Sequence, residues 1–190
     1  MTKKAIKRHS APLTPQSDTT PVTVHVDDSA RLREIRQLVR VNNRSELDDN
    51  LIICQIYMES RFDPNARAQG SSARGLMQLL KAPVRELYRV RNLKKPRSER
   101  QSESTVFAEA DRFHDSPEFV DESTNIRTGT AYLQHLIESE TARGAIDPVA
   151  EAYKDYRGVR NGIYYRKIRS AADQLGANPD SMQILRGMVK

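Results

Sequence analysis

Residues 48–64, DDNLIICQIYMESRFDP, are the most informative stretch of the sequence for the fold. The stretch opens with Asp48 and Asp49, and the apolar residues that follow cover most of a helix surface. Such a distribution is typical of a helix that is buried on several sides. Pro64 ends the helix, because the residue before a proline is pushed out of the helical region. We therefore expect a helix over about 48–61 with neighbouring elements on several of its faces.

Apolar residues recur at intervals of three and four in several other segments, which predicts further helices. The expected ranges are 28–42, 75–88, 123–137, a helix that begins at Asp147-Pro148, 163–175 closed by Gly176, and 179–188. Pro83 is expected to kink the second of these helices or to split it in two. Residues 28–190 show no sustained two-residue alternation of the kind that marks a strand. The sequence predicts a mainly α fold.

Length and composition limit the class of protein. The 190 residues fit one domain with a single hydrophobic core. No apolar run approaches the roughly 18 residues that a membrane-spanning helix needs. Lys and Arg outnumber Asp and Glu by 31 to 25, for a net charge of +6 and a pI near 9.5. This balance favours an anionic partner such as nucleic acid, an acidic membrane surface or an anionic cell-wall polymer.

The first 27 residues differ in composition from the rest of the chain. They are rich in Thr, Pro, Ser and Lys, and their few apolar residues show no regular spacing. Such a segment cannot bury enough surface to offset the entropy of ordering it, so 1–27 are expected to form a disordered basic arm before a domain at 28–190. The arm begins with basic residues but lacks the apolar stretch of a secretory signal peptide.

Residues 91–122 show little apolar periodicity. A basic run over 91–100 precedes a strongly acidic one over 109–122. Long loops inside compact domains are usually functional or disordered. We expect 91–122 to be a mobile surface excursion that borders the functional cleft.

Neither the cysteine nor the histidines of this chain predict a metal site. Cys54, the one cysteine, lies in an apolar run and is expected to be a buried, inert thiol. Two of the four histidines lie in the basic arm, which makes a histidine-based metal site or catalytic triad improbable. No Gly-rich phosphate loop follows a strand. The sequence predicts no metal and no cofactor.

Glu59 is a carboxyl group at the end of an otherwise apolar helix. Partial burial would raise its pKa toward the range of a general acid, and cleavage of a glycosidic bond needs such a proton donor for the leaving oxygen. The alternative is a plain helix-end acid that pairs with Arg61 or Arg74. Position alone favours this alternative.

Three separated blocks favour the catalytic interpretation. Residues 59–66 (ESRFDPNA) with 71–79 (SSARGLMQL), 125–129 (NIRTG) with Tyr132-Leu133, and Ala152-Tyr153 keep the order and spacing of one signature. This signature resembles that of the lytic transglycosylase (SLT) domain family, which is related to goose-type lysozyme within the lysozyme-like superfamily. The resemblance spans about 30–170 and implies a helical, lysozyme-like domain with a cleft.

The resemblance also implies roles for single residues. Glu59 looks like the catalytic acid, which would first protonate the glycosidic oxygen and then act as a base. The residues expected to bind the substrate are Ser71, Ser72, Gly75, Met77, Gln78, Asn125 and Tyr153.

Among these residues, Gly75, Met77 and Gln78 would form the cleft wall, with Gly75 allowing close approach of the backbone to the sugar. Ser72 or Ser71 would hold an N-acetyl group.

For three of these residues a structural role competes with the functional one. Tyr153 would orient Glu59 or pack in the core with a solvated hydroxyl. Met77 would line the cleft or pack in the core. Asn125 would cap a helix rather than contact sugar.

One block departs from the family pattern. After Ala152-Tyr153 the family usually continues with Asn, Ala and Gly, whereas this chain has Lys154, Asp155 and Tyr156. We therefore expect one substrate contact to be lost or altered.

The resulting hypothesis is a peptidoglycan lytic transglycosylase that cleaves the β-1,4 bond between N-acetylmuramic acid and N-acetylglucosamine and leaves a 1,6-anhydro end. A hydrolysing muramidase is the alternative, and it would need a second carboxylate, from Asp111, Asp115 or Asp121, about 6.5–9.5 Å from the first. A non-catalytic wall-binding module is the alternative from another class. A nucleic-acid binder is suggested by Lys94-Lys95-Pro96-Arg97, but no readout motif supports it.

Peptidoglycan glycan strands are the expected partner, and the cell wall in the periplasm is the expected place of action. Because no secretory signal is expected, export would use a bacterial secretion apparatus or a phage route. A secretion apparatus and an inhibitor protein are the other candidate partners. No specific nucleic acid and no membrane span are expected.

Overall fold

The computed structural model describes residues 28–189, so the predicted arm of residues 1–27 lies outside it. Within this range the chain forms eight α-helices and two short 3-10 helices, without a strand. The elements are α1 Ala30–Asn42, α2 Asp49–Ser60, α3 Lys81–Leu93, η1 Arg97–Glu99, α4 Glu103–Asp115, η2 Pro117–Val120, α5 Glu122–Ala142, α6 Pro148–Arg157, α7 Ile163–Ala177 and α8 Met182–Met188. The prediction of a mainly α fold is confirmed. None of these helices is long and apolar enough to cross a membrane.

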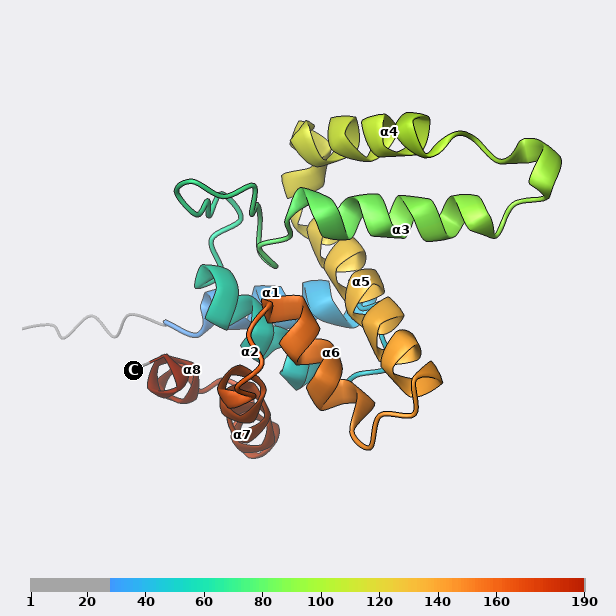
Figure 1. Ribbon diagram of the computed structural model, residues 1–190. Coiled ribbons are helices and arrows are strands. Elements are labelled where there is room, and N and C mark those ends of the chain that lie inside the picture. The colour runs from blue at the N-terminus through green and yellow to red at the C-terminus, as the bar shows by residue number, and fades with distance from the viewer. Residues whose placement is uncertain (1–27, 190) are drawn as a thin grey trace, which may run out of the picture.

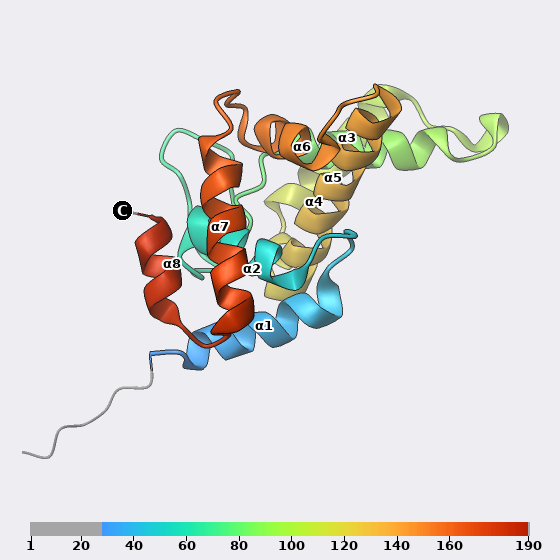
Figure 2. The same cartoon turned by 90° about the horizontal axis from the view of Figure 1, so that it is seen from below.

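α2 is the central helix of the fold. Asp48 caps it by accepting a hydrogen bond from the backbone N–H of Asn50 at 2.8 Å. All residues from 51 to 57 are buried, and α1, α7 and α8 pack against the helix (Figure 2). The predicted all-round burial of this helix is confirmed, and it includes Cys54, whose burial raises the pKa of its thiol to about 12.

α2 ends at Ser60, four residues before Pro64. Arg61 and Phe62 both have left-handed backbones, with φ of 56° and 68°, a conformation that non-glycine residues seldom adopt. The chain therefore reverses direction directly after Ser60. This sharp reversal brings the loop of residues 61–80 back over the end of α2.

The third helix begins later than predicted. Residues 75–80 form a turn in which Gly75 and Gln78 have positive φ, and the Arg74 N–H donates to the Leu79 carbonyl at 3.2 Å. α3 starts at Lys81. Pro83 therefore lies in its first turn, where a missing N–H leaves no helical hydrogen bond unmade. The predicted kink at Pro83 was wrong for this reason.

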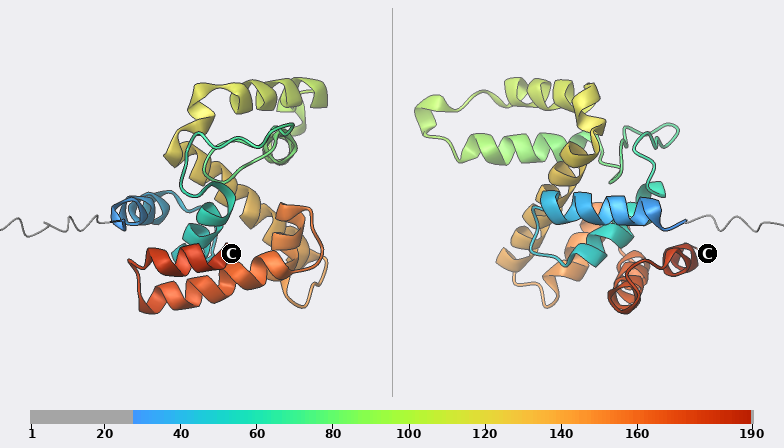
Figure 3. Two further views of the ribbon diagram at one scale, coloured as in Figure 1. Left: turned by 90° about the vertical axis from the view of Figure 1, so that its left-hand side faces the viewer. Right: turned by 180° about the vertical axis from the view of Figure 1, so that it is seen from behind.

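The expected loop at 91–122 is largely helical. α3 and α4 run antiparallel as a hairpin that stands away from α1, α7 and α8 (Figures 1 and 3). Ser102 caps α4 by accepting from the Thr105 N–H. Only Val106, Ala110 and His114 of α4 are buried, and this narrow stripe among acidic residues explains why the sequence pattern missed the helix.

The remaining helices follow their sequence signals more closely. Asp121 caps α5, and Asp147 caps α6 with Pro148 in its first turn. Gly176 lies inside α7, which ends at Ala177, so the expectation that this glycine closes the helix was wrong. α6 packs on both α5 and α7, and this packing brings the end of α6 and the start of α7 toward the end of α2.

Candidate active site

Glu59 lies in the last turn of α2 and is half-buried. The hydroxyl of Tyr164, at the start of α7, donates a hydrogen bond to its Oε1 at 2.5 Å. Burial and the charge of Glu59 raise the pKa of Tyr164 well above its usual value, so this phenol stays protonated and remains a donor. The contact fixes one carboxylate oxygen and leaves the other for a ligand.

The environment of Glu59 favours its protonated form. Burial raises the pKa of the carboxyl group, and three weaker influences oppose this rise: the Tyr164 hydrogen bond and the positive charges of Arg157 and Arg61. Arg157 lies over the Tyr164 ring, with its guanidinium carbon 5.8 Å from the ring centre. Glu59 can thus hold a proton, and the anion left after its transfer has a donor and two cations nearby.

A cavity of about 330 Å³ opens beside Glu59. This volume is at the lower end of the range of small-molecule sites, roughly 300–1,000 Å³. Side chains from α2, the 61–80 loop, α3, α5 and α6 line it: Met58, Glu59, Ala68, Ser71, Ala73, Gln78, Leu79, Leu80, Pro83, Tyr132, Tyr156 and Arg157. Of the predicted site residues, Glu59, Ser71 and Gln78 meet here.

Gln78 is held in place by its own loop. Its backbone is left-handed, with φ of 46°, and its Nε2 donates to the carbonyls of Ala66 at 2.8 Å and Gly75 at 2.9 Å. Both amide hydrogens have partners, so Oε1 is the atom left to accept from a ligand.

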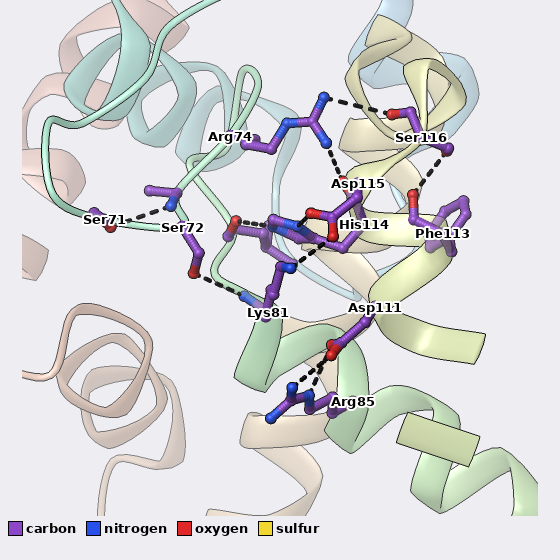
Figure 4. Close-up of polar contacts among 12 residues, drawn as sticks. Ser71, Ser72, Arg74, Lys81, Arg85, Asp111, Phe113, His114, Asp115 and Ser116 are labelled. Atoms are coloured by element: carbon purple, nitrogen blue, oxygen red, sulfur yellow. Dashed lines mark hydrogen bonds and ion pairs between the residues drawn. The ribbon is translucent and has the colours of Figure 1, made fainter. Parts of the chain in front are cut away.

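The structure separates the two candidate serines. Ser71 lines the cavity, and its Oγ accepts from the Ala73 N–H at 3.1 Å. Ser72 points the other way, and its Oγ accepts from the Lys81 N–H at 3.2 Å, at the start of α3 (Figure 4). Ser72 therefore supports a helix end, and Ser71 is the serine that can reach a ligand.

Gly75 and Asn125 form a structural pair behind the cavity wall. A Cβ at Gly75, whose φ is 76°, would lie 2.3 Å from Nδ2 of Asn125. Asn125 is fully buried. Its Oδ1 accepts from the Met77 N–H at 2.9 Å, and its Nδ2 donates to the Phe119 carbonyl at 3.1 Å. Asn125 thus holds the turn around Met77, while Asp121 caps α5, and any side chain at position 75 would clash with the asparagine.

Met77 is a core residue. Its side chain is fully buried and packs on Gly129 of α5, where a Cβ would lie 2.3 Å from the Met77 sulfur. The Met77 carbonyl accepts from the Tyr156 hydroxyl at 2.7 Å. The Met77 side chain thus packs in the core, while its carbonyl holds Tyr156, which lines the cavity.

Tyr153 does not orient Glu59. It is 1 % exposed, it stacks on Tyr165 with the ring centres 4.9 Å apart, and its hydroxyl has no hydrogen-bond partner within residues 28–189. The hydroxyl that reaches Glu59 belongs to Tyr164. The ring of Tyr153 packs in the core, and its hydroxyl makes no hydrogen bond to Glu59.

The three acids proposed as a second carboxylate lie outside the cavity. Arg85 binds Asp111 through two nitrogens, at 2.7 and 2.5 Å, and Lys81 binds Asp115 at 2.6 Å (Figure 4). These hydrogen bonds hold the pKa of both carboxyl groups below their usual range. Asp121 caps α5 by accepting from the Thr124 N–H at 2.9 Å. All three acids have their hydrogen-bond partners within α3, α4 and α5, and none of them lines the Glu59 cavity.

Four aromatic or basic residues of the site were not among the expected site residues: Tyr132, which stood in the signature without a role, and Tyr156, Arg157 and Tyr164. Tyr164 falls on a helix whose apolar pattern explained it as core, and Tyr156 was noted only as a departure from a pattern. The one usable signal is the excess of tyrosine over 153–165, four residues in a short stretch.

Among residues 28–189, no group of three histidine, cysteine or carboxylate side chains is placed to hold a metal ion.

Comparison with known families agrees with this geometry. The family described as Transglycosylase SLT domain matches residues 39–155, more than half of the chain. Comparisons with curated proteins and with solved structures gave no match. The matched range contains Glu59, Ser71 and Gln78 and ends just before Tyr156, so Tyr164 lies beyond it.

Proposed function

Because the chain belongs to the transglycosylase SLT domain family, we propose that it cleaves peptidoglycan. In this proposal Glu59 alone serves as both the acid and the base. The family supports a lytic transglycosylase-type function on the cell-wall polymer. The finer proposal is cleavage of the β-1,4 bond between N-acetylmuramic acid and N-acetylglucosamine with formation of a 1,6-anhydro end.

One observation carries the single-acid mechanism. Glu59 is the one carboxylate among the described residues that line the cavity. A hydrolase that inverts configuration would need a second carboxylate to hold water about 6.5–9.5 Å away. Asp111 and Asp115 are instead engaged by Arg85 and Lys81.

The first step is proton transfer from Glu59 to the glycosidic oxygen. The bond to C1 of N-acetylmuramic acid breaks, the N-acetylglucosamine hydroxyl leaves, and positive charge develops at C1. Burial raises the pKa of Glu59 and so favours the protonated form that this step needs. The Tyr164 hydroxyl and the Arg157 charge then stabilise the carboxylate.

The second step returns the proton. The carboxylate of Glu59 removes the proton from the 6-hydroxyl of the same sugar, and that oxygen bonds to C1 and closes the 1,6-anhydro ring. Atoms and charge balance without water. Glu59 is again protonated, ready for the next bond.

The other polar groups of the cavity suit sugar binding. Oε1 of Gln78 can accept from a sugar hydroxyl or an acetamido N–H, and the Ser71 hydroxyl can donate to an acetamido carbonyl. The Tyr132 and Tyr156 rings, with centres 5.9 Å apart, offer apolar faces for a pyranose ring. Tyr156 takes the third of the three positions at which the family usually has Asn, Ala and Gly, and we assign the altered contact to it.

Membership of the family implies that the protein acts on the cell wall. Delivery by a secretion apparatus or a phage particle, and control by an inhibitor protein, remain proposals. Pull-down from a producing cell with Glu59→Gln as bait tests them, since that variant does not lyse the wall on which it is trapped.

Product analysis separates the transglycosylase from the muramidase. Mass spectrometry of soluble fragments should show anhydro ends, lighter by one water than reducing ends. Reducing ends as the main product would replace the proposal with hydrolysis.

A further inference from the structure

Six cations form no ion pair with a described residue of 28–189: four of them line one hollow, and the other two follow Lys94 closely in the chain. We name this set the basic surface: Arg44, Arg91, Lys94, Lys95, Arg97 and Arg127. Arg127 donates only to uncharged oxygens, of Asn42 and Thr124. Several other cations of the fold are paired with acids, as in Arg85–Asp111 and Arg160–Asp155.

Part of the basic surface lines a hollow of about 770 Å³, separate from the Glu59 cavity. Arg91 and Lys94 of α3 line it together with Arg127 of α5 and Arg44 of the loop after α1. Tyr88 and Phe113 form apolar wall, with the Arg91 guanidinium 5.0 Å from the centre of the Tyr88 ring. The hollow can therefore take a ligand that carries both charge and apolar groups.

The hollow also contains acids. Glu118 and Glu138 line it beside the four cations, and His135 is occupied by Glu86 at 3.2 Å. The hollow therefore carries a positive net charge, although side chains of both signs line it. A densely charged phosphate polymer would meet repulsion from these two carboxylates, whereas a ligand with spaced carboxylates and an amino group would fit both signs.

The tip of the α3–α4 hairpin extends this surface outward and is closed by hydrogen bonds between its two strands of chain. Nδ2 of the buried Asn92 donates to the Gln101 carbonyl, and the Gln101 N–H donates to Oδ1 of Asn92, both at 3.0 Å. This reciprocal pair closes the tip, which projects from the body of the molecule (Figure 1). Lys94, Lys95 and Arg97 lie on this tip, at the end of α3 and the start of η1.

α3 connects the two sites. Pro83 lines the Glu59 cavity near its start, and Lys94 follows its end, about 17 Å further along at 1.5 Å per residue. We propose that the basic surface binds the carboxylate-bearing stem peptides of peptidoglycan, away from the sugar bond that is cut. The proposal rests on the proposed function. A second contact would retain the enzyme on the wall between cuts, because binding at one site raises the effective concentration at the other.

The test uses the full chain with Glu59→Gln, so that binding is measured without lysis. Binding to purified sacculi is followed by co-sedimentation, with and without the added changes Arg91→Glu and Lys94→Glu. The matched control carries Arg40→Glu and Arg166→Glu, which reverse two exposed cations on α1 and α7. Sacculi whose carboxylates have been amidated, and vesicles containing an anionic phospholipid, are the comparison ligands.

The proposal expects the Arg91/Lys94 reversal to weaken binding to sacculi at least about tenfold at low salt, far more than the control. On amidated sacculi the reversed and unreversed proteins should bind alike. A reversal no worse than the control, or one whose effect persists on amidated sacculi or appears only on vesicles, overturns it. Failure of the proposed function would show differently, as absence of lysis by the protein with Glu59 intact.

Discussion

The Tyr164 hydroxyl donates to Oε1 of Glu59, although 105 positions separate the two residues. The contact joins the start of α7 to the end of α2. It pairs a half-buried acid with a donor that lowers its pKa against the larger, opposite effect of burial. The balance of these two effects sets the pH at which the acid is protonated.

Tyr164→Phe should change the pH profile as well as the rate. Loss of the donor raises the pKa of Glu59, so the alkaline limb of wall lysis should move to higher pH. The rate at the optimum should fall about tenfold, because the carboxylate is less well positioned. Tyr165→Phe on the same helix is the control and should leave the profile in place. If the alkaline limb of Tyr164→Phe stays in place, the Tyr164 hydroxyl does not set the pKa of the catalytic acid.

Glu59→Gln should stabilise the fold at neutral pH. Burial raises the pKa of Glu59 in the folded protein above its usual value of 4.5. The stability linked to its protonated form is therefore present below the unfolded pKa and is lost as pH rises through the folded pKa. Thermal melts should give the variant the higher Tm at pH 7, with the gap closing below about pH 4.5. A lower Tm for the variant at pH 7 would mean that Glu59 is stabilising as an anion.

Asn125→Ala should destabilise the domain by about 2–3 kcal/mol in urea unfolding, because it leaves buried backbone groups without partners. Gly75→Ala should cost at least about 1 kcal/mol, from its positive φ and from the clash with Asn125.

The two changes together should cost less than their sum, by roughly 0.5–3 kcal/mol, since the alanine at 125 makes room for the new Cβ. Strict additivity would show that the close approach of Gly75 and Asn125 is relieved in some other way.

Neutralising the acids of the α3–α4–α5 region should leave catalysis nearly intact. Asp111→Asn, Asp115→Asn and Asp121→Asn should each stay within about threefold of the parent in wall lysis, far from the 100-fold or greater loss typical of removing a general base. Asp121→Asn tests a helix cap at the same time, although asparagine caps nearly as well as aspartate. One position with a loss of about 100-fold would restore the two-carboxylate mechanism.

Local sequence patterns were enough to predict the helices that have a clear apolar pattern or a capping residue. α2 has an apolar run and a capping Asp48, and α6 has Asp147 followed by Pro148. α4 buries only three residues, and such a narrow stripe does not differ from chance in an acidic segment.

The candidate site was partly predictable for a related reason. Glu59 and Gln78 stood in a family signature, which fixes identity and spacing. Tyr153 and Tyr164 cannot be told apart by spacing, because both lie on apolar helix faces and only the packing of α7 on α2 decides which hydroxyl meets Glu59. Asn125 was misjudged because a buried side chain that holds a distant turn leaves no local pattern.

The most direct test compares the parent protein with Glu59→Gln in release of soluble fragments from purified peptidoglycan, with the fragment ends identified by mass spectrometry. The parent should release anhydro-ended fragments. The folded variant should release fragments at least about 100-fold more slowly, because the amide cannot donate and recover a proton. Release by Glu59→Gln at more than about a tenth of the parent rate would contradict the claim that Glu59 is the acid and base.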